Sequence, residues 1–387
     1  MSKFATNTQH PPSSSPHPLS PHPIKLSLHR MFLHNFNAGP SILPPTVLEE
    51  AAAAIRDFAG SGLSLLEIGH RTKLFTPVME EARQLVRELM QLHPDQEVLF
   101  LHGGASTQFM QVPMNLLPAN GKAAYTNTGI WSAKAIKEAT LFGAVEIAGS
   151  AKEGGYREIP KTLEIDPSAQ YLHLTTNETI HGLQWQQLPL NVDLPLVADM
   201  SSDILSRSLP FDRFGLIYAG AQKNMGAAGV NLVIVNKNLL GKTDRRIPTM
   251  MDYREHIREA SMLNTPPVFA VYVALLTLRW VKHEGGIGEM EKRSRQRSQL
   301  LYETLDACPI FECPVNATDR SHMNAVFTIK DPRIEEAFSK ACADAGMIGI
   351  KGHRNLGGFR VSLYNALPLE SVVALTTLMK DFARTHG

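Results

Sequence analysis

The chain has 387 residues, of which 43% are hydrophobic, so it is long enough for one large domain and a smaller one. Its 38 lysines and arginines balance 37 aspartates and glutamates, so no global field favours nucleic acid or an anionic membrane. No apolar run reaches the roughly 20 residues that span a bilayer. Three cysteines without zinc-site spacing fit a reducing cytoplasm and predict neither a disulfide framework nor a metal site.

Residues 1–30 differ in composition from everything that follows. The stretch QHPPSSSPHPLSPHPIK is rich in Pro, Ser and His and has no apolar periodicity. Such a segment cannot bury enough surface to offset its ordering entropy, so we predict a disordered tail. Two interpretations stay open. The segment is either a dispensable extension with Met31 as the true start, or an organelle transit peptide, because Glu49 is the first acidic residue.

Beyond Met31, segments with helical apolar spacing alternate with short apolar runs. In chain order we expect helices at 46–58 and 78–92, strands at 98–101 and 123–125, a helix at 130–142, and strands at 171–174, 195–198, 216–219 and 230–235. Helices at 267–280 and 289–305 follow, and then strands at 324–329 and 359–363 mix with helices at 333–345 and 369–384. This order predicts an α/β protein with a mainly parallel sheet in a large domain at 31–290, and a smaller α+β domain at 291–387.

Lys223 is a lone lysine in the stretch AGAQKNMG at 219–226, between two apolar strands. An ammonium group is strongly hydrated, so a lysine here needs either exposure or a reason for burial. A desolvated lysine has a lowered pKa and can form a Schiff base with an aldehyde. The alternative is an inert lysine on an exposed turn.

Asp199 ends the predicted strand at 195–198 and precedes Lys223 in the chain. A carboxylate in this position can hold the pyridinium nitrogen of pyridoxal phosphate protonated, which makes the ring an electron sink. The alternative is an aspartate that caps a helix before Ser201 and Ser202. Ligands of open α/β sheets bind beyond the carboxyl ends of the strands, where both residues fall.

The turn HGGASTQ at 102–108 follows a predicted strand and precedes an expected helix. Small residues let backbone N–H groups approach a phosphate, and a helix N-terminus favours negative charge. The turn lacks the residues of a P-loop or a dinucleotide fingerprint. Nearby, Trp131 is suited either to stacking on a flat ring or to an ordinary place in the core.

Two Gly-His-Arg triplets occur, Gly69-His70-Arg71 and Gly352-His353-Arg354, and Lys351 and Arg360 flank the second. The guanidinium fork matches carboxylate and phosphate in a bidentate manner. Two such clusters in a neutral protein predict a dianion site, against the alternative of solvated surface cations.

The ordered motifs of the chain resemble those of the phosphoserine aminotransferase family, within the class-V, fold-type-I pyridoxal-phosphate enzymes. The resemblance covers about 35–387 and implies a seven-stranded sheet. It rests on Asn37-Ala38-Gly39-Pro40, Gly69-His70-Arg71, His102-Gly103-Gly104, Asn177-Glu178-Thr179-Ile180, Ala198-Asp199-Met200-Ser201-Ser202, YAGAQKN at 218–224, Asn264-Thr265-Pro266-Pro267 and Lys351-Gly352-His353-Arg354.

The resemblance implies a pyridoxal 5′-phosphate cofactor. Lys223 would be the Schiff-base lysine, Asp199 would pair with the pyridinium nitrogen and Trp131 would stack on the ring. Thr179 would bond the ring hydroxyl. The cofactor phosphate would be held by residues from both subunits of a homodimer, namely Ala105, Ser106 and Gln222, and Asn264 and Thr265 of the partner subunit.

The resemblance also implies two small substrates, glutamate and phosphohydroxypyruvate. Arg360 would take the α-carboxylate. His70 and Arg71, with His353 and Arg354 across the dimer interface, would take either the substrate phosphate or the distal carboxylate of glutamate. One site would thus accept both anions in turn. Lys223, once released from the cofactor, would act as general base and acid.

The sequence departs from the family pattern at two places. Many relatives carry Gly-Arg-Gly or Gly-Cys-Gly where this chain has Ala105-Ser106-Thr107, and Thr176 stands where a proline often occurs. Because Ser106 can still donate a hydrogen bond, we expect altered phosphate contacts rather than their loss. Three alternatives remain: an alanine–glyoxylate transaminase, a cysteine desulfurase, and a non-catalytic protein that binds the cofactor.

Overall fold

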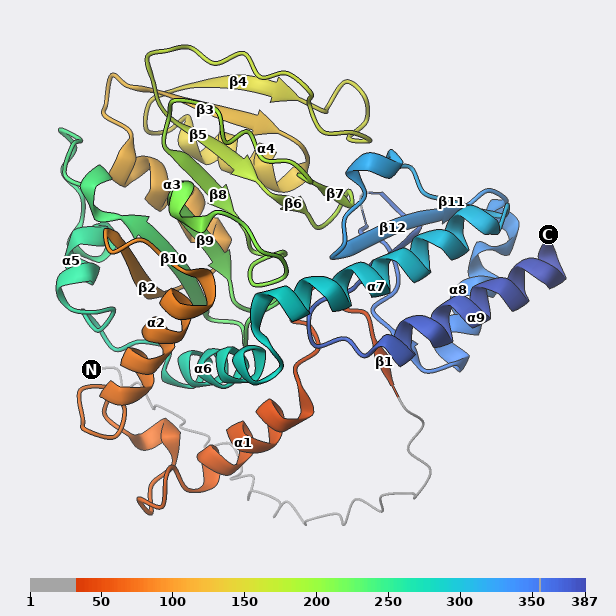
Figure 1. Ribbon diagram of the computed structural model, residues 1–387, viewed down its shortest axis with the longest axis horizontal. Helices are drawn as coiled ribbons and strands as arrows, with labels where there is room; N and C mark the ends of the chain where they lie inside the picture. Colours follow the sequence, from red (N-terminus) through yellow and green to blue (C-terminus); the bar gives the residue numbers. More distant parts are fainter. Residues whose placement is uncertain (1–32, 355) are drawn as a thin grey trace, which may run out of the picture. The chain divides into compact units, whose positions relative to one another are not determined.

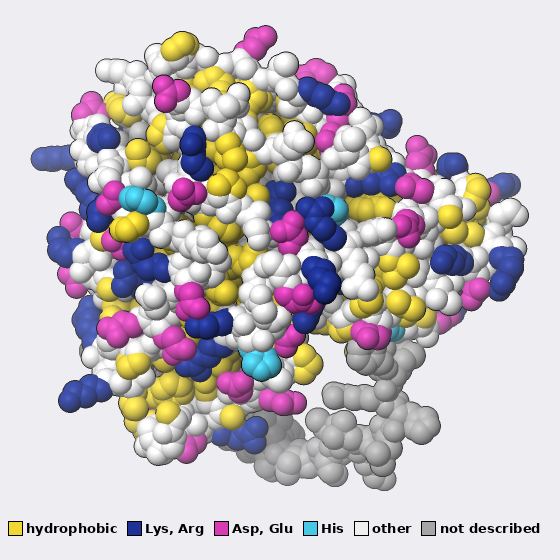
Figure 2. Space-filling model, in the orientation of Figure 1, with side chains coloured by type: hydrophobic (Ala, Val, Ile, Leu, Met, Phe, Trp, Pro, Cys, Tyr) yellow, Lys and Arg dark blue, Asp and Glu magenta, His cyan; other side chains and the backbone are white. Residues whose placement is uncertain are grey.

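The computed structural model describes residues 33–354 and 356–387, and residues 33–387 form one compact unit. The predicted tail at 1–30 and the alternative start at Met31 lie outside the described residues. Within the described part of the chain, no helix combines the length and apolar character of a membrane span. On the face drawn in Figure 2, basic and acidic side chains are interspersed, as the near-zero net charge predicts.

A seven-stranded sheet forms the centre of the larger part of the structure (Figure 1). In spatial order its strands are β2 (Gln96–His102), β10 (Val230–Asn236), β9 (Phe214–Gly220), β8 (Leu196–Asp199), β5 (Ala169–Thr175), β3 (Lys122–Asn127) and β4 (Ala144–Ser150). Strand β10 runs antiparallel to both of its neighbours, and the other adjacent pairs are parallel. The mainly parallel, seven-stranded sheet is therefore confirmed.

Helices cover both faces of this sheet. Side chains alternate along each strand, so Val98 and Phe100 of β2 join one apolar core while Leu99 and Leu101 join the other. The first core is closed by α2 (Thr76–Met90) and α6 (Val268–His283), and α1 (Pro45–Arg56) packs on α6. The second core is closed by α3 (Ala105–Leu116), α4 (Ile130–Ala139) and α5 (Tyr253–Arg258).

The C-terminal part has its own antiparallel sheet and its own core. The strands are β11 (Phe311–Glu312), β12 (Asn324–Ile329) and β14 (Phe359–Ser362), accompanied by α7 (Gly286–Ala307), α8 (Glu335–Asp344) and α9 (Leu369–His386). Strand β1 (His34–Asn35) pairs in parallel with β13 (Met347–Ile348), so the beginning of the described chain packs on this part. The domain boundary predicted at residue 290 falls within α7 and stays a prediction.

The structure contains several elements that the sequence patterns did not predict. Strand β4 lies at the edge of the sheet and is only partly buried, so it lacks the continuous apolar run that identifies the central strands. The two-residue strands β6 (Asn177–Glu178) and β7 (Leu183–Gln184) form a short hairpin after β5. Short 3₁₀ turns occur at Leu65–Glu67, Phe211–Arg213, Lys237–Leu239, Thr249–Met251, Ala317–Asp319 and Pro332–Ile334.

Candidate active site

The residues singled out by their position after strands lie at one edge of the sheet. Asp199 is the last residue of β8, Lys223 lies three residues beyond the end of β9, and Trp131 lies in α4 after β3. Because β3, β5, β8 and β9 run in parallel, their carboxyl ends meet at this edge. Thr179 joins them from the turn of the β6–β7 hairpin.

The amine of Lys223 is partly buried and contacts two of the predicted residues. Its Nζ donates a hydrogen bond of 2.8 Å to Oγ1 of Thr179 and lies 5.2 Å from the centre of the Trp131 ring. Burial lowers the pKa of Lys223, while the nearby Asp199 carboxylate raises it. The lysine is therefore held among protein groups and is not a solvated turn residue.

The turn that carries Lys223 is fixed by the segment at 37–41. The N–H of Ser41 donates to the carbonyl oxygen of Gln222 at 3.0 Å, and the hydroxyl of Ser41 donates to the carbonyl oxygen of Lys223. A Cβ at Gly39 would lie 3.2 Å from Cγ of Lys223, and Gly39 has a φ of +139°. Gly39 thus allows the backbone to pass close to the lysine stem.

Asp199 is buried beneath this edge, with 5% of its surface exposed. Its Oδ1 accepts a hydrogen bond of 2.9 Å from the N–H of Ser201. Burial raises the pKa of Asp199, while the Lys223 ammonium lowers it. Behind it, Tyr218 stands directly opposite Asp199 on β9 and contacts Nε2 of His173 through its hydroxyl at 2.8 Å.

The turn at the end of β2 leads into the N-terminus of α3, as predicted. Gly104 precedes the helix, no side chain caps it, and Ala105 and Ser106 are its first two residues. A Cβ at Gly104 would meet no atom within 4 Å, so space is open in front of this helix end. Backbone N–H groups at such an end attract an anion.

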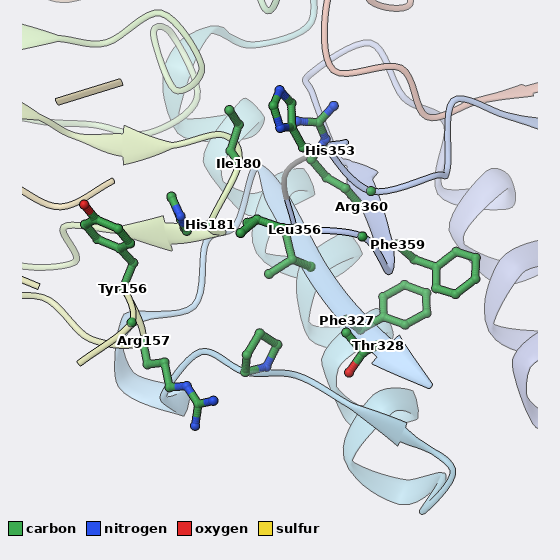
Figure 3. A pocket seen from close by; sticks show the side chains of 15 residues that line it. Tyr156, Arg157, Ile180, His181, Phe327, Thr328, His353, Leu356, Phe359 and Arg360 are labelled. Carbon is green, nitrogen blue, oxygen red and sulfur yellow. The ribbon is translucent and has the colours of Figure 1, made fainter. Parts of the chain in front are cut away.

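A cavity of ≈ 230 Å³ adjoins the hairpin turn and is lined on its other side by residues of β12 and β14 (Figure 3). Ile180 and His181, which follow Thr179, line one side, and His353 and Arg360 lie near each other at one end. Burial lowers the pKa of Arg360, and its Nε is buried without a hydrogen-bond partner in the described chain. No carboxylate is among the described residues that line this cavity.

The remaining predicted residues fall into two places. His353 and the exposed Arg354 belong to the loop that borders this cavity. His70 and Arg71 lie instead beside the segment at 262–265, since Nη2 of Arg71 donates to the carbonyl oxygens of Met262 and Leu263 at 3.3 Å.

The segment at 262–265 also approaches the end of β2. Nδ2 of Asn264 lies 3.4 Å from Nδ1 of His102, and Thr265 is exposed. This grouping places four predicted anion-binding residues on one surface of the chain, namely His70, Arg71, Asn264 and Thr265.

One buried carboxylate at this edge was missed by the sequence patterns. Glu178 precedes Thr179 and is fully buried; its charge raises the pKa of Lys223, and the Asp199 carboxylate raises the pKa of Glu178. Glu178 belongs to the motif Asn177-Glu178-Thr179-Ile180, but a glutamate is expected to be exposed unless a partner is known. An acidic residue flanked by Asn177 and Thr179 within a run of otherwise uncharged residues was the available signal.

The three cysteines lie in the C-terminal part and are free. Cys308 and Cys342 are buried in the core of that part, and burial raises the pKa of Cys342 to about 12. Burial also raises the pKa of Cys313. These thiols lack the lowered pKa of a desulfurase nucleophile. Among residues 33–354 and 356–387, no group of three His, Cys, Asp or Glu side chains could hold a metal ion.

Comparison with known proteins agrees with this geometry. The family model described as aminotransferase class-V matches residues 33–375. A phosphoserine aminotransferase from Flavobacterium psychrophilum is 54% identical over 349 residues, which are 90% of this chain and 98% of the relative. One from Nitrosomonas europaea is 46% identical and spans 92% of this chain and 99% of the relative.

Solved structures give the same result. Phosphoserine aminotransferase from Bacillus circulans subsp. alkalophilus superposes with a TM-score of 0.89 at 41% identity, covering 92% of this chain and 99% of that one. An alanine–glyoxylate aminotransferase from Nostoc sp., at 17% identity and a TM-score of 0.70 over 92% of this chain and 97% of that one, shares the fold alone. The chain therefore belongs to the phosphoserine aminotransferases of the class-V aminotransferase family.

Proposed function

We propose that this chain transfers an amino group reversibly between glutamate and 3-phosphohydroxypyruvate, giving 2-oxoglutarate and O-phosphoserine. The observation that carries the proposal is the partly buried amine of Lys223, held by Thr179 and placed against Trp131 above the buried Asp199. The proposal draws further support from the family to which the chain belongs.

The described residues fit pyridoxal 5′-phosphate as the cofactor. Lys223 offers an amine for covalent attachment, Asp199 a buried carboxylate for a ring nitrogen, and Trp131 a flat face for a ring. Ala105 and Ser106 offer an uncapped helix end with open space before it for a phosphate. In the dimer that we propose, Asn264 and Thr265 of the partner subunit complete this phosphate site together with Gln222.

When bound, pyridoxal phosphate supplies an aldehyde that attaches to amines and a ring that accepts electrons. Lys223 does the protein's part of the chemistry. Its amine would be the attachment point, and once released it would take the proton from Cα of the amino acid and deliver it to the carbon that had been the aldehyde carbon of the cofactor. Burial lowers its pKa, which increases the fraction of neutral amine available for both tasks. Asp199 supplies the negative charge that keeps a ring nitrogen protonated.

The basic residues hold the substrates. Arg360 would bind the α-carboxylate, because its guanidinium is partly buried and its Nε has no hydrogen-bond partner in the described chain. His353 and Arg354 lie beside the same cavity. His70 and Arg71 are grouped with Asn264 elsewhere on the chain, which supports a site that two subunits of a homodimer share.

We extend the proposal to location and substrate range. Three free cysteines and no disulfide in the described residues fit a cytoplasmic enzyme. A site that binds a phosphorylated three-carbon acid through its two ends could also aminate the longer phosphorylated acid of pyridoxine synthesis, and comparing the two acceptors tests this extension.

A spectral half-reaction tests the proposed function. Purified holoenzyme is mixed with glutamate, and the absorbance of the bound cofactor is followed until it changes. Adding 3-phosphohydroxypyruvate should restore the first spectrum and release O-phosphoserine, whereas glyoxylate should restore it much more slowly. A spectrum that glutamate leaves unchanged would favour a non-catalytic protein, and faster recovery with glyoxylate would favour an alanine–glyoxylate transaminase.

A further inference from the structure

Glu178 joins two parts of the site that are far apart in the chain. It lies in β6 with none of its surface exposed. Its Oε1 accepts a hydrogen bond of 3.0 Å from the N–H of Ser132, and its Oε2 accepts one of 3.2 Å from the N–H of Trp131. The carboxylate therefore closes the N-terminus of α4, where unpaired N–H groups and the helix dipole favour negative charge.

The same residue holds the group on the other side of Lys223. Its carbonyl oxygen accepts a hydrogen bond of 2.8 Å from the N–H of Gly182, which closes the turn containing Thr179. Thr179 contacts the Lys223 amine at 2.8 Å, and the Trp131 ring lies 5.2 Å from it. Both neighbours of the amine are thus tied to one buried residue: Trp131 to the carboxylate of Glu178, and the turn with Thr179 to its backbone carbonyl.

Gly129 shows that the local backbone is built around this carboxylate. A Cβ at Gly129 would overlap the carboxyl carbon of Glu178, would lie 2.5 Å from Oε2 of Glu178 and would lie 2.8 Å from Nδ1 of His181. The φ of Gly129 is 166°, an extended value that any residue adopts. Glycine is therefore required here for space and not for conformation.

The charge of Glu178 also acts on the amine. Burial raises the pKa of Glu178 to about 7, against the lowering effect of the hydrogen bonds from Ser132 and Trp131. Its carboxylate raises the pKa of Lys223, as Asp199 does. The side chain thus has an electrostatic effect on Lys223 as well as a geometric one.

We infer that Glu178 is a positioning residue, which fixes the Trp131 indole and the Thr179 hydroxyl in one arrangement around Lys223. It acts through these two residues and through the effect of its charge on Lys223, and it makes no hydrogen bond to the Lys223 amine. The inference rests on the proposed function, because Trp131 and Thr179 matter only if Lys223 carries the cofactor.

The first test compares E178Q with the wild-type holoenzyme. The amide keeps the shape but removes the charge and turns an NH₂ group toward a backbone N–H. We expect kcat to fall by about tenfold or more, because two charge-assisted hydrogen bonds to the start of α4 are weakened, with little change in KM for glutamate. The pH midpoint of the bound cofactor's absorbance should fall by about one unit. E138Q, in the last turn of α4, is the matched control and should leave both quantities unchanged.

The second test moves the carboxylate without removing its charge. G129A should displace Glu178, and so lower kcat and reduce the quenching of tryptophan fluorescence by added pyridoxal phosphate. The pH midpoint of the bound cofactor's absorbance should change less in G129A than in E178Q. In an E178A background the overlap with the carboxyl group is gone and only the 2.8 Å approach to Nδ1 of His181 is left, so the fall in kcat caused by G129A should become smaller. This test stands even if E178Q does not fold.

The outcomes separate the inference from the proposed function. If the Glu178 and Gly129 variants lose only stability, and keep the wild-type kcat, pH midpoint and fluorescence quenching, then Glu178 is merely a helix cap and the inference is wrong. If the wild type itself binds no cofactor or gives no half-reaction, the proposed function fails instead.

Discussion

The amine of Lys223 and the hydroxyl of Thr179 form a 2.8 Å hydrogen bond between segments that are 44 residues apart in the chain. Thr179 lies in a hairpin turn after β5, and Lys223 follows β9. These strands flank β8, which ends at Asp199. The parallel sheet thus brings an amine, a hydroxyl and a carboxylate together without any of the three being close in sequence.

Replacing the buried carboxylate below the cofactor site should lower turnover with little loss of folding. Asn in D199N keeps the acceptor for the N–H of Ser201 but removes the charge. We expect kcat to fall by about tenfold to a hundredfold, the range that matches the loss of a charge-assisted hydrogen bond. Steady-state kinetics measure this, and D212N at an exposed position is the control. Wild-type kcat in D199N would contradict the role assigned to Asp199.

The helix end at Ser106 should respond to charge in opposite ways for cofactor binding and for stability. S106A removes one hydroxyl, so we expect pyridoxal phosphate to bind about two- to tenfold more weakly. S106D should weaken binding much further, although an acid in the first turn stabilises a helix by about 0.3–1 kcal/mol. Fluorescence titration and urea unfolding measure the two effects. If S106D and the wild type bound pyridoxal phosphate with equal affinity, the cofactor phosphate would not bind at this helix end.

A conservative change at Arg360 should affect substrate binding. Lysine keeps the charge but not the planar fork that bonds a carboxylate in a bidentate manner. We expect R360K to raise KM for glutamate by about tenfold, the equivalent of about 1.4 kcal/mol, and R333K at an exposed ion pair to leave it unchanged. An unchanged KM in R360K would place the α-carboxylate elsewhere.

His173 should make stability depend on pH. Burial lowers its pKa to about 3 from the ordinary value of 6.5. Between these values the unfolded chain binds a proton that the folded chain does not, so stability rises with pH across this window and is constant above it. The full effect is up to about 5 kcal/mol. Urea unfolding from about pH 4 to pH 7 should show a smaller rise for H173Q, and a difference between the two proteins that does not vary with pH would contradict this.

Much of the fold was predictable because the central strands are buried on both faces. The run at 230–235 in β10 is apolar except for Asn231 and rich in β-branched residues, and it identified a strand without any knowledge of the fold. Strand β4, at the exposed edge, gives no such signal, and the hairpin of β6 and β7 is too short to show a period.

The site was predictable where a polar residue ends an apolar run, as Asp199 does. Glu178 was not, because its burial depends on the N-terminus of α4 pointing at it from 46 residues away. His173 was hidden for a similar reason, since its partner Tyr218 lies on another strand. The roles assigned to the other predicted site residues stay predictions until they are measured.

The central claim is that Lys223 carries the cofactor, and covalent trapping tests it most directly. Holoenzyme is reduced with borohydride and digested, and mass spectrometry locates the residue that bears the pyridoxyl phosphate mass. The account predicts modification at Lys223, no trapping in K223A, and unchanged trapping in K137A on the exposed side of α4. Trapping at another lysine, or K223A protein that still completes repeated turnovers, would contradict it.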